Sequence, residues 1–122
     1  RPIVHDERLR LAIESITKDP NFPDRPFNLQ SSYNLLAMCD YQQERYDSAI
    51  HHAQLAVKFY PRNPFPYSTL AEIYAITENR DSFYINLELA VERGFALATY
   101  ANQPPYDKYS KEERFQNLIL KN

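Results

Sequence analysis

The chain has 122 residues, of which 43% are hydrophobic and 25% charged, and its formal net charge is −2. That length fits one domain with a modest core, and the single glycine makes an all-β fold unfavourable because tight turns between strands depend on glycine. Acidic side chains outnumber basic ones between Ser31 and Asp107, and no apolar run approaches membrane-spanning length. We therefore expect an all-α domain that neither binds nucleic acid nor inserts into a membrane.

The first predicted helix covers residues 5–18. Its apolar side chains recur at helical spacing, as Leu9, Ala12, Ile13 and Ile16. The helix is expected to stop before Pro20, since proline cannot continue it. Residues 21–28 contain Pro23 and Pro26 and are predicted to form an extended connection.

Residues 29–42 and 46–60 predict a second and a third helix. One side of the second helix carries Tyr33, Leu36, Ala37 and Tyr41, and one side of the third carries Ala49, Ile50, Ala53, Ala56 and Val57. Small side chains on the third helix allow a neighbouring helix to approach closely. Because the link between the two is short, they are predicted to form an antiparallel hairpin.

A second hairpin is predicted to begin at Asn63, a favourable N-cap that Pro64 follows at the first helical position. Its first helix places Tyr67, Leu70, Ala71 and Tyr74 inward, and its second carries Phe83, Leu87, Ala90 and Val91. That second helix is expected to start near Asp81. Gly94 is predicted to end it, because glycine adopts the left-handed conformation of a C-terminal cap most easily.

The remaining residues predict two further elements. A short helical turn is expected around residues 97–101, before Pro104 and Pro105 interrupt it. Ser110 and Glu113 have the spacing of a capping box, and the final helix after them has an apolar edge of Phe115, Leu118 and Ile119. We expect this helix to cover the open side of the second hairpin.

The two hairpins repeat each other at an offset of 34 residues. Tyr33, Leu36, Ala37 and Ala56 recur as Tyr67, Leu70, Ala71 and Ala90. Such a period is typical of stacked helix-turn-helix units. Equivalent side chains are therefore predicted to occupy equivalent environments in the two hairpins.

These residues resemble the tetratricopeptide repeat family, whose unit carries an aromatic residue, Leu-Gly and Tyr, then Ala, an aromatic residue, Ala and Pro. In the first copy the matching residues are Tyr33, Leu36, Ala37, Ala49, Ala56 and Pro61, and the departures are Asp40 and Ala53. In the second copy the matching residues are Tyr67, Leu70, Ala71, Tyr74 and Ala90, and the departures are Phe83, Leu87 and Phe95. The resemblance implies a right-handed stack of antiparallel helical hairpins, a solenoid flanked by N- and C-terminal helices.

On this interpretation residues 1–122 form a single helical domain. Its parts are a helix of a partial repeat at 5–18, repeat one at 29–63, repeat two at 64–95 and a C-terminal capping segment at 96–122. Ala12, Ser15 and Pro20 have the mutual spacing of Ala53, Ala56 and Pro61, which suggests the partial repeat. The tail after Gly94 resembles the closing segment that follows the last repeat in many bacterial proteins of this type. The sequence thus resembles the C-terminal repeats of a larger protein.

The resemblance implies a protein-interaction module, because the first helices of such hairpins line a concave groove that receives a peptide or a partner helix. The groove candidates in this chain are Ser31, Asn34, Met38 and Tyr41 from hairpin one, and Phe65, Ser68, Glu72 and Ala75 from hairpin two. A clamp for a terminal carboxylate would need Lys, Arg and Asn, and only Asn34 fits. Packing in the core is the alternative role of each residue, since aromatic residues at helical spacing most often serve it.

An alternative function is that of a structural or regulatory extension, packed against an upstream catalytic or receptor domain of the same polypeptide. The start at Arg1-Pro2 and the terminal character of the tail favour it. The expected partner is then the upstream domain instead of a separate protein or peptide.

Catalysis is not expected, and neither is a metal ion or another cofactor. The chain has no HExxH, CxxC or glycine-rich phosphate loop. His51 and His52 are neighbours on a helix and point about 100° apart, so they cannot readily share one metal ion. They are predicted to be surface residues, with Asp47 able to pair with His51 one turn later.

Overall fold

The computed structural model describes the backbone of residues 2–121 and the side chains of residues 6–121. Within this range every regular element is helical, which confirms the all-α prediction. The elements are α1 (Pro2–Lys18), α2 (Arg25–Gln42), α3 (Tyr46–Phe59), α4 (Pro64–Ile76), α5 (Arg80–Glu92), α6 (Leu97–Tyr100), the 3₁₀ helix η1 (Tyr106–Lys108) and α7 (Glu113–Leu120). No helix among these residues is long and apolar enough to cross a bilayer.

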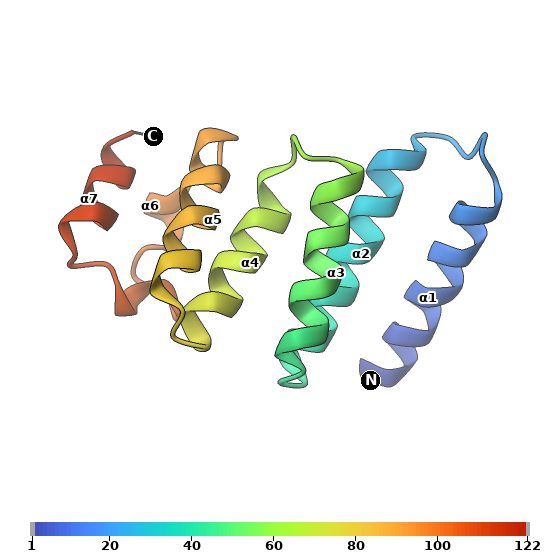
Figure 1. Ribbon diagram of the computed structural model, residues 1–122, viewed down its shortest axis with the longest axis horizontal. Coiled ribbons are helices and arrows are strands. Elements are labelled where there is room, and N and C mark those ends of the chain that lie inside the picture. The colour runs from blue at the N-terminus through green and yellow to red at the C-terminus, as the bar shows by residue number, and fades with distance from the viewer. Residues whose placement is uncertain (1, 122) are drawn as a thin grey trace.

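The helices follow one another across the molecule in chain order, from α1 at one end to α7 at the other (Figure 1). Each of the first four packs against the next, and short turns make α2 with α3 and α4 with α5 two antiparallel hairpins. In addition α2 packs against α4. The first helices of the two hairpins are therefore neighbours and can share a surface.

The turns inside the two hairpins keep the 34-residue offset. Glu44 and Glu78 occupy equivalent positions and both have a φ of 61°. The same backbone hydrogen bond closes both turns, from Arg45 N to Asp40 O and from Asn79 N to Tyr74 O, each at 2.9 Å. The two hairpins thus have the same backbone geometry where their helices reverse.

The equivalent tyrosines, Tyr33 and Tyr67, each contact a side chain at the C-terminal end of the second helix of their hairpin, although Tyr67 is buried and Tyr33 is half-buried. The ring of Tyr33 stacks on that of Phe59, near the end of α3, with 5.7 Å between the ring centres. The guanidinium carbon of Arg93, just after α5, lies 4.6 Å from the ring centre of Tyr67. Phe59 and Arg93 are themselves 34 residues apart. In both hairpins the tyrosine of the first helix is thus covered by the last turn of the second.

Both ends of the second hairpin form as predicted. The Asn63 side-chain oxygen accepts a hydrogen bond from Phe65 N at 2.8 Å, which caps α4 ahead of Pro64. Gly94 has a φ of 100° and follows α5. Its N–H donates to Val91 O, and Phe95 N donates to Ala90 O, each at 3.0 Å. This pair of hydrogen bonds is a Schellman motif, which satisfies carbonyl groups at the end of α5.

The predicted extended connection at residues 21–28 is wrong in its second half, because α2 begins at Arg25 instead of Leu29. Pro26 lies in the first turn of the helix, where a missing N–H leaves no hydrogen bond unmade. The chain reverses just before, at Asp24, whose φ is 48°.

The predicted capping box at the last helix is also wrong. The N-cap of α7 is Glu112, and no side chain caps this helix. The Ser110 hydroxyl donates to Asp107 O at 3.1 Å instead. Glu112 accepts hydrogen bonds from Arg80 and the Tyr84 hydroxyl, both at 2.7 Å, so this carboxylate joins α7 to α5.

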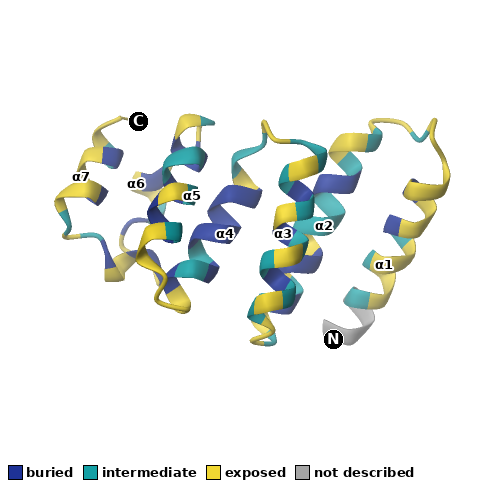
Figure 2. Cartoon of the chain, viewed as in Figure 1, coloured by how far each residue is buried: buried dark blue, intermediate teal, exposed yellow. Residues whose placement is uncertain are grey.

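The largest buried cluster surrounds α4 and α5 and continues into the C-terminal segment. Its fully buried side chains include Phe83, Tyr84, Leu87, Leu97 and Phe115, and Tyr106 is 2% exposed. Figure 2 shows that α4 is largely buried, whereas α1, at the other end of the molecule, is largely exposed. Among the described side chains of α1, from residue 6 onward, Ile13 and Ile16 are buried, and they pack with Leu29 and Leu36 of α2.

Candidate functional site

A continuous depression lies between α2 and α4, and we call it the α2–α4 groove. It comprises a hollow of about 400 Å³, lined by Asn34, Met38, Phe65, Ser68, Thr69, Glu72, Phe95 and Tyr100. An adjoining hollow of about 220 Å³ is lined by Met38, Tyr41, Gln42, Thr69 and Glu72. Met38, Thr69 and Glu72 belong to both, so the two hollows form one groove.

The groove is accessible and partly apolar. Met38 of α2 and Phe65 of α4 are 43% and 54% exposed, although both are large hydrophobic side chains. The rings of Phe95 and Tyr100 stack with 5.1 Å between their centres and line the same hollow. Apolar surface left open in this way is a common property of ligand and protein interaction sites.

Two polar groups of the groove lack a strong partner within residues 6–121. The Oδ1 atom of Asn34 is buried and has no hydrogen-bond partner there. Glu72 Oε2 lies 3.3 Å from the Tyr106 hydroxyl, which also lies 3.3 Å from Ser68 O. Burial raises the pKa of Glu72 above its ordinary value, and the Tyr106 hydrogen bond offsets part of that shift. The half-buried Glu72 carboxylate can accept further hydrogen bonds from a ligand.

Six of the eight groove residues predicted from the sequence line the groove: Asn34, Met38, Tyr41, Phe65, Ser68 and Glu72. Ser31 is half-buried on α2 and lines neither hollow. Ala75 is fully buried in the core, so its inclusion among the groove residues is corrected. The C-terminal segment covers this end of α4, where Lys108 Nζ donates to Ala75 O at 2.9 Å.

Four further lining residues were missed by sequence reasoning: Gln42, Thr69, Phe95 and Tyr100. Gln42 and Thr69 lie on the two helices from which the other candidates came, so helical spacing could have included them. Phe95 and Tyr100 follow the Gly94 cap, and no periodicity of the sequence connects them to the groove. Their position depends on how the chain turns after α5.

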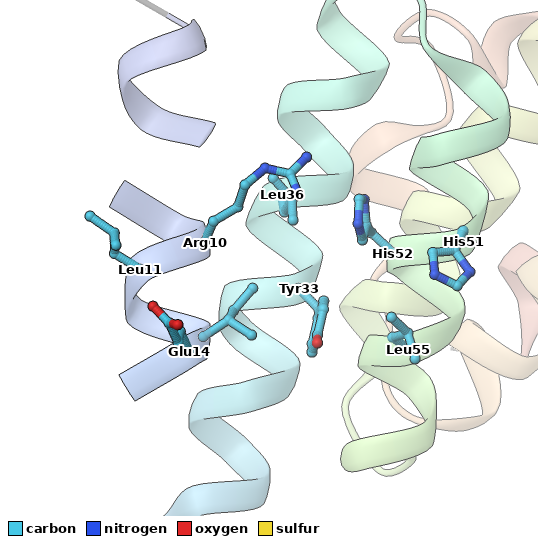
Figure 3. A pocket seen from close by; sticks show the side chains of 9 residues that line it. Arg10, Leu11, Glu14, Tyr33, Leu36, His51, His52 and Leu55 are labelled. Atoms are coloured by element: carbon cyan, nitrogen blue, oxygen red, sulfur yellow. The ribbon is translucent and has the colours of Figure 1, made fainter. Parts of the chain in front are cut away.

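Apart from the α2–α4 groove, a hollow of about 460 Å³ lies on a different side of α2, between α1 and α3. Figure 3 shows Arg10 and Glu14 of α1 on one side of it, His51 and His52 of α3 on the other, and Tyr33 of α2 between them. Leu11, Ile13, Leu36 and Leu55 complete its lining. We call it the α1–α3 hollow.

His52 has a partner that the sequence did not predict. Its Nδ1 atom lies 2.6 Å from Oδ2 of Asp40, a fully buried carboxylate of α2. The same carboxylate accepts hydrogen bonds from Arg45 at 2.7 and 3.1 Å and from the Ser48 hydroxyl at 3.0 Å. Burial acts to raise the pKa of Asp40, but these three partners outweigh it and hold the pKa below its ordinary value. The prediction that both histidines are surface residues therefore holds only for His51, which is exposed.

The Asp40 network also joins α1 to the first hairpin. Arg45 donates a second strong hydrogen bond, at 2.7 Å, to Asp6 of α1. Of the polar residues that line the α1–α3 hollow, His52 belongs to this network. Among residues 6–121, no three His, Cys, Asp or Glu side chains gather where they could hold a metal ion.

In comparisons with known proteins, no protein-family model, no curated protein and no solved structure matches this chain.

Proposed function

We propose that this chain is a tetratricopeptide-repeat-like solenoid that binds an extended segment of a partner protein in the α2–α4 groove, and that it catalyses no reaction itself. The shared 34-residue geometry of the two hairpin turns supports the repeat assignment. The right-handed stacking of these hairpins and their role as a binding scaffold belong to the same proposal.

The observation that carries the functional proposal is the presence of exposed apolar side chains and an unpartnered acceptor in one groove. Met38 and Phe65 are open to solvent, and the buried Asn34 Oδ1 beside them has no donor among residues 6–121. A buried acceptor without a donor costs about 1–3 kcal/mol. A bound peptide would remove that cost, because its backbone presents N–H donors along its whole length.

The composition of the groove also fits an extended segment. Met38 can adapt its shape to different side chains, and the aromatic rings provide contact area at a small cost in conformational entropy. The groove lies across two neighbouring helices and continues through two hollows, which suits a chain that places successive side chains along it.

The proposal can be tested by selecting peptides from a random dodecapeptide library against the purified chain and measuring their dissociation constants by fluorescence polarisation. Met38→Lys introduces a charge into the groove and is expected to weaken binding at least about 10-fold, an effect of about 1.4 kcal/mol. Ile85→Lys is the matched control, because Ile85 is 54% exposed on α5 and lines neither hollow of the groove. It should leave binding unchanged.

Two results would contradict the proposal. One is a selection that yields no peptide of measurable affinity. The other is a set of peptides whose binding Met38→Lys and Phe65→Ala both leave at full strength, which would show that another surface captured them.

A further inference from the structure

The α2–α4 groove has an uncompensated negative charge. Among the residues that the structure describes, Glu72 is its single charged lining residue, and no Lys, Arg or His lines either hollow. Other partly buried carboxylates of the chain have an arginine beside them, since Glu88 is 3.0 Å from Arg114 and Glu112 is 2.7 Å from Arg80. For Glu72 the corresponding polar contact is the neutral hydroxyl of Tyr106, at 3.3 Å.

Burial without a cation makes the charged form of Glu72 unfavourable in the free chain, and its pKa is raised accordingly. A carboxylate in this position is therefore a source of binding energy for a positively charged ligand. The gain would be larger than at an exposed site, because a half-buried pair is less screened by water and salt.

The aromatic side chains around Glu72 fit the same kind of ligand. Tyr41, Phe65, Phe95 and Tyr100 line the two hollows in which Glu72 takes part. A cation over an aromatic face is attracted by the negative charge of the ring face, and the guanidinium group of arginine stacks on such faces especially well. Asn34 lines the same hollow as Glu72, and its buried Oδ1 atom has no hydrogen-bond partner among residues 6–121.

We propose that the groove selects partner segments that carry an arginine, whose guanidinium group pairs with Glu72 while the rest of its side chain lies against Phe65 and Met38. This inference rests on the proposed peptide-binding function and names the residue that the groove recognises. Lysine is the weaker alternative, because an ammonium group is more strongly hydrated and cannot form the planar two-point pair with a carboxylate.

The first test uses the peptides selected from the random library. They should be enriched in arginine at one fixed position relative to an apolar residue. Replacing that arginine by citrulline, which has nearly the same shape but no charge, should weaken binding to the unaltered chain about 10-fold or more.

The second test locates the arginine at Glu72. Glu72→Gln should weaken the arginine peptide about 10-fold and leave the citrulline peptide nearly unchanged, so the two changes together cost little more than either alone. Glu7→Gln is the matched control. Glu7 is exposed on α1 and lies outside the groove, so this substitution removes the same charge without changing the groove. Folding is not expected to obscure this result, because burial raises the pKa of Glu72 by penalising its charged form, and the neutral amide of glutamine avoids that penalty at nearly the same shape.

The outcomes separate this inference from the function on which it rests. If Met38→Lys abolishes binding but the citrulline peptide and Glu72→Gln have no effect, the groove binds peptides without selecting arginine, and the inference is overturned. If citrulline weakens binding equally in the unaltered chain and in Glu72→Gln, the arginine contacts another group and the assignment to Glu72 is wrong. If no peptide binds the groove, both proposals fail.

Discussion

The two hairpins have the same turns but fill their interiors with different chemistry. Asp40 in hairpin one is equivalent to Tyr74 in hairpin two, and Ala49 is equivalent to Phe83. Around Asp40 the space is occupied by a hydrogen-bonded network with Arg45, Ser48 and His52. Around Phe83 it is occupied by aromatic rings, with the Tyr109 ring centre 4.2 Å away. A repeated backbone thus needs only a few shared positions, and the remaining interior can be polar or apolar.

The difference also determines which hairpin depends on the C-terminal segment. The core of hairpin two continues into Tyr106, Tyr109 and Phe115, all from beyond the repeat. Hairpin one instead uses the Asp40 network and its connection to Asp6 of α1. We therefore expect aromatic truncation to be most costly in hairpin two, and the loss of a single carboxylate to be most costly in hairpin one.

The largest expected effect is that of Phe83→Ala. Phe83 is fully buried, so its loss should lower the free energy of unfolding by about 3–5 kcal/mol. Chemical denaturation monitored by circular dichroism would measure it. Ile85→Ala, at an exposed position of the same helix, should change stability by about 0.5 kcal/mol or less. A loss below about 1 kcal/mol for Phe83→Ala would contradict the aromatic core of hairpin two.

Asp40→Asn should have the next largest effect, about 2–4 kcal/mol, because it leaves the donors of Arg45 and His52 without a charged acceptor. The matched control is Asp47→Asn, at an exposed position of α3, which should be nearly neutral. If the two variants have equal stability, the Asp40 network contributes nothing to hairpin one.

The same carboxylate predicts a pH dependence of stability. In the folded chain, burial acts to raise the pKa of Asp40, but hydrogen bonds from Arg45, His52 and Ser48 outweigh burial and lower it. In the unfolded chain this pKa is about 3.9. The contribution of Asp40 is therefore complete above about pH 4 and is lost as the pH falls through the folded pKa. In acid denaturation curves, the stability difference between the unaltered chain and Asp40→Asn should shrink below about pH 4. A constant difference down to pH 2 would show that the pKa is not lowered.

Gly94→Ala should cost about 1–2 kcal/mol through backbone strain alone. Its φ of 100° is unfavourable for any side chain, although an added Cβ would meet no atom within 4 Å. Thermal unfolding would measure the loss, with Glu92→Ala as an exposed control in the preceding turn. An unchanged melting temperature would mean that the turn after α5 relaxes without cost.

The smallest effect tests the equivalence of the two turns. Glu44→Gly and Glu78→Gly should each stabilise the chain by up to about 1 kcal/mol, because glycine tolerates the left-handed conformation that both residues adopt. Glu7→Gly in α1 should instead destabilise it by up to about 1 kcal/mol. Opposite signs for Glu44 and Glu78 in thermal unfolding would show that the turns are not equivalent.

The sequence predicted the helices and the turns where one local rule was sufficient. Asn63 with Pro64 determined the start of α4, and Gly94 determined the end of α5. It failed at Pro26 and Ser110, where two local rules competed: proline can precede a helix or open it, and serine can cap a helix or close a turn. Local spacing does not decide between such alternatives.

The candidate site was predicted from the family resemblance, which assigns the groove to the first helix of each hairpin and so named Asn34, Met38 and Glu72 together. It was not predictable where tertiary contacts decide burial or pairing. The Asp40–His52 pair joins residues of different helices, and Ala75 is buried by the C-terminal segment. Neither arrangement follows from periodicity, because both depend on which elements meet in space.

The claim that the two hairpins form one binding surface between α2 and α4 is tested most directly by amide chemical-shift mapping of a selected peptide bound to the chain. The account predicts that the largest shifts fall on α2 and α4 around Asn34, Met38, Phe65 and Glu72, and on Phe95 and Tyr100 after α5. Shifts concentrated instead around Arg10, Tyr33 and His52, in the α1–α3 hollow, would contradict it.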